Sequence, residues 1–146
     1  MRHQIAATSA FIFHNGKALI ALRAKNDDYL PDYWEQVGGK LDWGEHPEEG
    51  VAREVQEEAG LTVRATQFYA VMNYINEKKE RHVVEIAYIC EIVGSPDVTL
   101  SDEHQEYRWI TREEVESVAP MSDEMREYLR QGFKVRKNGS VSQKPH

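Results

Sequence analysis

Apolar residues recur along the chain in short runs separated by polar turn residues, a pattern that predicts several strands. The runs Ile5–Phe13 and Ala18–Leu22 flank an Asn-Gly pair, which is the strongest short signal for a β-hairpin. The runs 63–75 and 82–93 flank a charged turn in the same way. We therefore predict an antiparallel hairpin at the start of the fold and a second, longer hairpin in its middle.

The segment 47–59 carries the clearest helix signals in the chain. Pro47 suits the first helical turn, the two glutamates that follow it stabilise the positive end of the helix dipole, and Gly60 is placed to end the helix. Before this helix, residues 24–36 form a polar, irregular stretch, and a short extended piece follows at 37–39. We expect the polar stretch to be a surface loop beside a functional site.

The C-terminal part of the chain is predicted to contain one strand and two helices. Residues 107–110 form the last apolar run, and Thr111 with Glu114 matches the capping box of a short helix. Ser122 is placed to cap a second helix that runs to about Gln131.

Length, charge and cysteine content exclude several classes of protein. A chain of 146 residues suits one domain, which we place at residues 1–133, followed by a basic tail at 134–146 that is expected to be mobile. No apolar stretch could span a bilayer and the N-terminus lacks the features of a secretory signal, so we expect a cytoplasmic protein with no membrane partner. The lone Cys90 lies in an apolar run and is expected to be a buried, unreactive thiol. The net charge of −7 argues against nucleic acid as a partner, and a protein this acidic needs metal cations to bind phosphates.

Three glutamates of the predicted helix 47–59 are placed to act together. At about 100° per residue, Glu54, Glu57 and Glu58 lie on one arc of the helix. An adjacent arc, which would face the core, carries the apolar residues Val51, Ala52, Val55 and Ala59. Carboxylates this close repel one another, and hard divalent cations with oxygen ligands relieve that repulsion. Magnesium binds in this way while sharing its other positions with water and phosphates, so the pattern indicates phosphate chemistry.

For the three glutamates alone, the solvated face of an amphipathic helix is the simpler interpretation. The wider pattern is far more specific, because it also includes Gly39, Glu45, Arg53 and Gly60. The segment from Gly39 to Leu61 resembles the Nudix box in full, and the order of predicted elements on either side is similar to the Nudix fold. The resemblance implies an α+β fold, a mixed β-sheet sandwiched between α-helices (an α/β/α sandwich), over about residues 4–132.

The same resemblance implies an enzyme. Nudix hydrolases cleave, with the help of metal ions, a phosphoanhydride bond in a nucleoside diphosphate linked to another moiety. The expected cofactor is Mg²⁺, for which Mn²⁺ can substitute, and the expected partner is a nucleotide-derived small molecule. We expect a nucleoside triphosphate as substrate, followed by nucleotide sugars and ADP-ribose. A homodimer is compatible with this interpretation.

The resemblance also implies roles for the matching residues. Glu57 and Glu58 are expected as direct metal ligands, Glu54 as a ligand or as the group that activates water, and the carbonyl of Gly38 as a further ligand. Arg53 is expected to orient a glutamate of the box, which suits a guanidinium beside carboxylates. Glu45 is expected in a supporting role. Gly39 lies in the loop that meets the substrate, and this chain departs from many members by having valine, in place of proline, before the Gly-Gly pair.

Three further candidates lie outside the box. The family often recruits a catalytic glutamate from another loop, and we favour Glu103 over Glu106, with a solvated acidic turn as the alternative. Trp34, together with Tyr29 and Tyr33, could stack on a base, although packing is the commoner fate of such rings. Arg23 could contact a phosphate, and a surface ion pair explains it equally well.

Two other function classes remain as alternatives. A nucleotide-sensing Nudix domain would bind without turnover, and such a protein is expected to lose glutamates that this chain keeps. A calcium-binding acidic helix is disfavoured because calcium loops place their oxygens on a tight turn.

Overall fold

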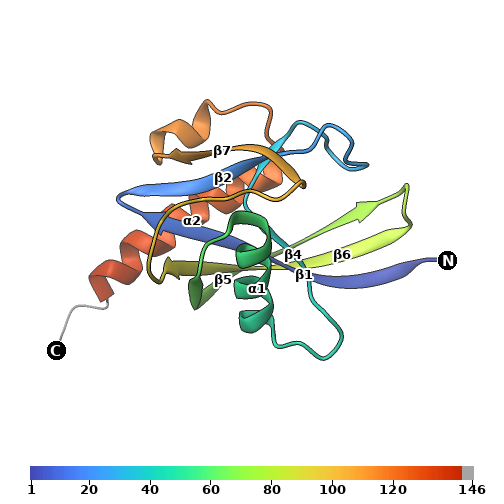
Figure 1. The fold of residues 1–146 in the computed structure, drawn as a ribbon, viewed down its shortest axis with the longest axis horizontal. Helices are drawn as coiled ribbons and strands as arrows, with labels where there is room; N and C mark the ends of the chain where they lie inside the picture. Colours follow the sequence, from blue (N-terminus) through green and yellow to red (C-terminus); the bar gives the residue numbers. More distant parts are fainter. Residues whose placement is uncertain (143–146) are drawn as a thin grey trace.

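The computed structural model describes residues 1–142, with side chains as far as Lys137 (Figure 1). The part of the chain that it describes contains seven strands, two α-helices and one 3₁₀ helix. The strands are β1 (His3–His14), β2 (Lys17–Arg23), β3 (Trp34–Glu35), β4 (Gly38–Lys40), β5 (Val63–Asn76), β6 (Arg81–Ile92) and β7 (His104–Ile110). The helices are α1 (Pro47–Ala59), η1 (Glu113–Glu116) and α2 (Asp123–Ser142). Over residues 1–142, neither α-helix is long and apolar enough to cross a membrane.

The strands form one mixed sheet in the order β3-β2-β1-β6-β5, with β4 paired to β1 and β7 paired to β2. The central pair β1 and β6 is parallel, whereas every other pair is antiparallel. Helix α1 lies on one face of the sheet and α2 on the other (Figure 1). The expected α/β/α sandwich is therefore confirmed.

Alternation along β1 divides the core into two layers. Phe11 is buried together with Leu129 and Phe133 of α2, whereas its neighbours Ala10 and Ile12 are buried in the layer that contains Val51 and Val55 of α1. Successive side chains of a strand point to opposite faces, so the same strand supports both helices. Because both layers bury apolar residues, the position of α1 relative to β1 is set by packing.

Both predicted hairpins are present. At the first, Phe13 pairs with Ala18 and His14 with Lys17. The turn residues Asn15 and Gly16 both have positive φ, 51° and 79°, which is the conformation that favours Asn-Gly in two-residue hairpin loops. At the second, β5 and β6 pair along nearly their whole lengths.

The helix ends follow the predicted signals. Pro47 is in the first turn of α1, the backbone N–H of Glu48 donates to Nδ1 of His46, and Gly60 ends the helix with a φ of 68°. At η1, Thr111 and Glu114 exchange side-chain and backbone hydrogen bonds as a capping box requires. The hydroxyl of Ser122 accepts the N–H of Met125 at the start of α2.

Three boundaries differ from the prediction. Helix α2 continues to Ser142, so the expected end near Gln131 is wrong. The reason is that its apolar face continues: Phe133 is buried and Val135 packs against the same core. Strand β7 begins at His104, earlier than expected, and the short strand β3 lies inside the stretch expected to be irregular. The predicted tail therefore begins as helix, and its last residues, 143–146, lie outside the described residues.

Gly132 is predicted to be essential for the packing of α2. A Cβ atom at this position would overlap the ring of the fully buried Phe11. Gly132→Ala gains about 1 kcal/mol of helix propensity but overpacks the core, which typically costs about 1–3 kcal/mol. We expect a lower melting temperature, measured by thermal unfolding, whereas Lys134→Ala at an exposed position of the same helix should change little. A Gly132→Ala protein as stable as the parent would contradict this account of the packing.

Candidate active site

A cavity of about 470 Å³ lies beside β1, β4 and α1 and collects the candidate residues. One group of lining side chains comes from α1 and from the loop before β7: Glu54, Glu57, Glu58 and Glu103. A second group comes from β2, β3, β5, β6, β7 and the loop after β2: Arg23, Asp27, Asp28, Tyr29, Glu35, Tyr74, Glu85 and His104. Gly38 and Gly39 of β4 lie on the same wall.

Packing of α1 explains why its glutamates face this cavity. Val51, Val55 and Ala59 are fully buried against the sheet, which turns the adjacent arc of the helix toward β4. Glu58 is only 4% exposed, and its Oε1 accepts the backbone N–H of Gly38 at 3.2 Å. The structure therefore brings the three glutamates predicted from the helical arc to one cavity.

Arg53 connects the carboxylates of this region. Its guanidinium donates to Glu45 at 2.8 Å, to Glu54 at 2.9 Å and to Glu57 at 3.1 Å, and also to the carbonyl of Lys40 at 3.0 Å. The hydrogen bonds from Arg53 lower the pKa of Glu45 to about 2, so that Glu45 stays ionised and holds the guanidinium. The geometry agrees with the orienting role expected for Arg53 and the supporting role expected for Glu45.

The two inner glutamates are held in unfavourable electrostatic surroundings. Burial, followed by the negative charges of Glu103 and Glu35, raises the pKa of Glu58 well above its usual value. Burial is also the main cause that raises the pKa of Glu54, against the opposing effect of Arg53. A cation between these carboxylates would oppose both shifts, because a nearby positive charge favours the ionised form.

The donor set suits a hard divalent cation in chemistry, since every candidate ligand is an oxygen. As the side chains stand, no three His, Cys, Asp or Glu residues within the described chain converge on a single point. Arg53 draws Glu54 and Glu57 to itself, and the amide of Gly38 holds Glu58. Binding of Mg²⁺ would thus require carboxylate rotations at the surface of a fixed helix. The predicted carbonyl ligand, Gly38, borders Glu58 through its N–H, and its role toward metal stays a prediction.

The raised pKa values of Glu54 and Glu58 predict a pH-dependent stability. In the folded, metal-free protein these groups hold protons more tightly than in the unfolded chain, so stability is lost as pH rises above their ordinary value of 4.5. Metal ligands must be deprotonated, so Mn²⁺ should raise the melting temperature more at about pH 8 than at about pH 6. Thermal unfolding across pH, with and without Mn²⁺, measures both effects. Glu58→Gln should weaken them, and a metal effect independent of pH would argue against this assignment.

The structure separates the two candidate loop glutamates. Glu103 lines the cavity, and its charge acts on both Glu54 and Glu58. Glu106 is exposed and is absent from the residues that line the cavity. The preference for Glu103 over Glu106 is thus consistent with position, and its catalytic role stays a prediction.

For the other two candidates outside the box, the structure favours the alternatives to substrate binding. Trp34 is only 7% exposed and belongs to the core, with the guanidinium of Arg108 5.6 Å from its ring centre. Its burial favours packing, the alternative given for this ring, and a role toward the substrate stays a prediction. Arg23 lines the cavity but is paired with Asp27 at 2.8 Å and Glu35 at 2.7 Å, so the ion-pair interpretation describes its state.

Several cavity residues carry no motif, and sequence reasoning missed them. Glu35 accepts hydrogen bonds from Arg23 and from the buried His104, the latter at 2.8 Å. Glu85 is the one acidic residue inside the run 82–90 of β6, in register with Val83 and Ala87 on the face that α2 covers. A charge at a core-facing position of a strand was the signal that could have found it.

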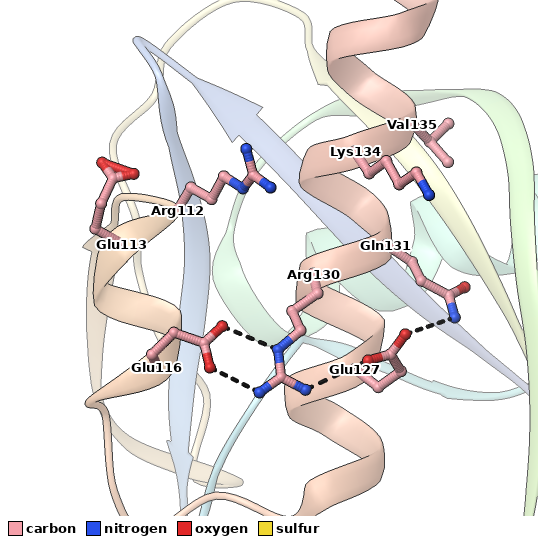
Figure 2. A pocket seen from close by; sticks show the side chains of 8 residues that line it. All are labelled: Arg112, Glu113, Glu116, Glu127, Arg130, Gln131, Lys134 and Val135. Carbon is pink, nitrogen blue, oxygen red and sulfur yellow. Dashed lines mark hydrogen bonds and ion pairs between the residues drawn. The ribbon is translucent and has the colours of Figure 1, made fainter.

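A larger hollow of about 760 Å³ lies between η1 and α2, away from the box residues (Figure 2). Two of its three carboxylates are already paired: Arg130 binds Glu116 at 2.7 Å and 2.9 Å and Glu127 at 3.3 Å. None of its lining residues belongs to the segment 39–61. Size therefore does not identify the functional site, whereas the convergence of carboxylates does.

Cys90 is fully buried, as expected, and burial raises the pKa of its thiol to about 12. It is therefore an unreactive core residue.

Comparison with known proteins agrees with this description. The model of the NUDIX domain matches residues 3–132. A MutT-like protein of Streptomyces ambofaciens is 32% identical over 113 residues, which cover 77% of this chain and 67% of that protein. The nucleoside triphosphatase NudI of Enterobacter sp. (strain 638) is 28% identical over 116 residues, covering 73% and 82% of the two chains. The crystal structure of a MutT protein from Methanosarcina mazei Go1 superimposes with a TM-score of 0.80 at 30% identity, over 94% of this chain and 96% of that one.

Proposed function

Because this chain belongs to the NUDIX domain family of hydrolases, we propose that it is a metal-dependent pyrophosphohydrolase that cleaves a phosphoanhydride bond of a nucleoside triphosphate. One relative is itself named a nucleoside triphosphatase, which favours this substrate over nucleotide sugars and ADP-ribose. The observation that carries the proposal is the convergence of Glu54, Glu57 and Glu58 on one cavity beside β4.

We assign the binding of Mg²⁺ to these three carboxylates. When bound, the ion neutralises phosphate charge and makes water a stronger nucleophile. Glu54, Glu57 and Glu58 would hold the ion, and the packing of α1 against the sheet keeps these side chains beside β4. Arg53 and Glu45 act as positioning residues, because Arg53 donates to the carboxylates of Glu54 and Glu57 and Glu45 holds the guanidinium of Arg53.

Glu103 is assigned the role of general base. A carboxylate that lines the cavity close to the α1 glutamates can take a proton from the attacking water and release it after the leaving phosphate has departed. Gly39 is assigned to the wall that meets the phosphates, and its lack of a side chain leaves room for Glu54, since a Cβ here would overlap the Glu54 carboxyl.

The test is release of phosphate or pyrophosphate from nucleoside triphosphates, nucleotide sugars, ADP-ribose and dinucleoside polyphosphates. We expect turnover with Mg²⁺ or Mn²⁺, its loss with chelator and its recovery when metal is restored. If the folded protein binds nucleotide but releases neither phosphate nor pyrophosphate from any compound of the panel, the proposal is overturned in favour of a sensing domain.

A further inference from the structure

The proposed hydrolysis assigns no role to the carboxyl group of Glu85. It projects from β6 into the cavity and also borders an adjoining hollow of about 50 Å³ under the loop after β2. Its neighbour Glu35 is satisfied by Arg23 and His104. Within the described residues, by contrast, the half-buried carboxyl of Glu85 makes no hydrogen bond and no ion pair. A polar group in such a place normally has a partner, so this one is available to a ligand.

The surroundings of Glu85 favour its protonated form. Burial raises its pKa to about 8, with the charge of Glu35 acting in the same direction and that of Arg23 opposing it. The titratable groups around it from the neighbouring elements are Arg23, Tyr29, Glu35, Tyr69, Tyr74 and Tyr128. A neutral carboxyl group offers one O–H donor next to one carbonyl acceptor.

Flat aromatic surfaces lie beside this carboxyl. The rings of Tyr29 and Tyr74 are stacked, with centroids 4.9 Å apart and planes 18° apart, and both residues line the cavity with Glu85. The guanidinium of Arg23 lies 5.6 Å from the centre of the Tyr29 ring. The two rings therefore give the cavity an aromatic wall beside Glu85.

Charge sets the direction in which a nucleotide would lie. The α1 glutamates and Glu85 line one cavity from two different elements, α1 and β6. On the side of Glu85, the cations Arg23 and Lys79 are already paired with carboxylates of Asp27, Glu35 and Asp28, which leaves them less available to a phosphate. The phosphates therefore belong beside α1 and the base beside Glu85.

We propose, resting on the proposed function, that Glu85 determines substrate specificity by hydrogen bonding to the edge of the nucleobase, with Tyr29 and Tyr74 beside the ring. Its ligand is a base that carries an acceptor next to an N–H donor, the complement of a carboxylic acid. Glu85 thereby contributes to binding and discrimination, and the hydrolytic step belongs to the residues of α1.

The experiment is calorimetric binding of the four ribonucleoside 5′-monophosphates, with ribose 5-phosphate as the ligand that lacks a base. These ligands need no hydrolysis, so the result is independent of whether the turnover assay succeeds. The parent protein should bind its preferred monophosphate at least about tenfold more tightly than ribose 5-phosphate. Glu85→Leu should lose about tenfold to a hundredfold toward that monophosphate and nothing toward ribose 5-phosphate.

Two matched variants distinguish recognition of the base by hydrogen bonding from an effect of Glu85 on packing. Glu85→Gln keeps a donor beside an acceptor and should retain the preference to within about threefold. Glu91→Gln lies on the same strand, paired with the exposed Arg64, and should behave like the parent. If Glu85→Leu fails to fold, the parent is titrated with an analogue of the preferred base without its exocyclic group, which should bind about tenfold more weakly. Unchanged preference in Glu85→Leu, full affinity for that analogue, or equal binding of all five ligands by the parent would overturn the proposal.

Discussion

Replacement of Glu58 by glutamine is expected to lower turnover by about a thousandfold while the fold stays intact. A bound metal ion supplies several kcal/mol of transition-state stabilisation, and each loss of about 1.4 kcal/mol is a factor of ten in rate. Glutamine has nearly the same shape and can still accept the N–H of Gly38, but it carries no charge for the ion. Because burial disfavours the charged form of Glu58, the metal-free variant should be at least as stable as the parent.

The measurement is kcat with Mg²⁺ on the best substrate of the panel, together with Mn²⁺ affinity by paramagnetic resonance. Glu57→Gln should show the same direction of change. Glu49→Gln, at an exposed position in the first turn of the same helix, is the control for the loss of one negative charge and should retain near-parent kcat. Near-normal turnover in both Glu57→Gln and Glu58→Gln would remove the assignment of the metal ligands.

Glu103→Gln is expected to lower kcat by about a hundredfold with little change in KM. A positioned general base contributes on the order of 10²–10⁴ to a rate, and Glu103 lines the cavity that the α1 glutamates share. The charge of Glu103 also raises the pKa of Glu58. Removing that charge should therefore make Glu58 easier to deprotonate and so favour its binding to metal. The fall in kcat should therefore occur without a loss of metal affinity.

Glu106→Gln is the matched control, since Glu106 lies three positions along the chain and outside the cavity lining. The two variants are compared by kcat and KM, and kcat should fall markedly only in Glu103→Gln. A larger loss in Glu106→Gln than in Glu103→Gln would reverse the assignment. Equal, small effects in both would indicate that water is activated by a residue of α1, with Glu54 as the remaining candidate.

Local patterns predicted the elements of the fold well wherever the determining residues are neighbours in sequence. Asn15 and Gly16 predicted a turn because their own backbone angles allow it, and Pro47 and Gly60 marked the ends of α1 for the same reason. The boundary of α2 failed because it depends on Phe133 finding a place against Phe11, far away in the chain. For Trp34 both base stacking and packing stayed open for a related reason, since an aromatic residue in a polar stretch shows nothing of its burial.

The sequence by itself determined the family, the carboxylate arc of α1 and the chemistry that such an arc supports, because helical periodicity places Glu54, Glu57 and Glu58 together without help from the rest of the chain. Only the tertiary structure decided what surrounds them. Pairing of β4 with β1 brings Gly38 to Glu58, and the parallel pairing of β1 with β6 brings Glu85 into the same cavity. These contacts join segments that are distant in sequence. They depend on how whole elements pack around a common core, and such packing leaves no signal in any short stretch of residues.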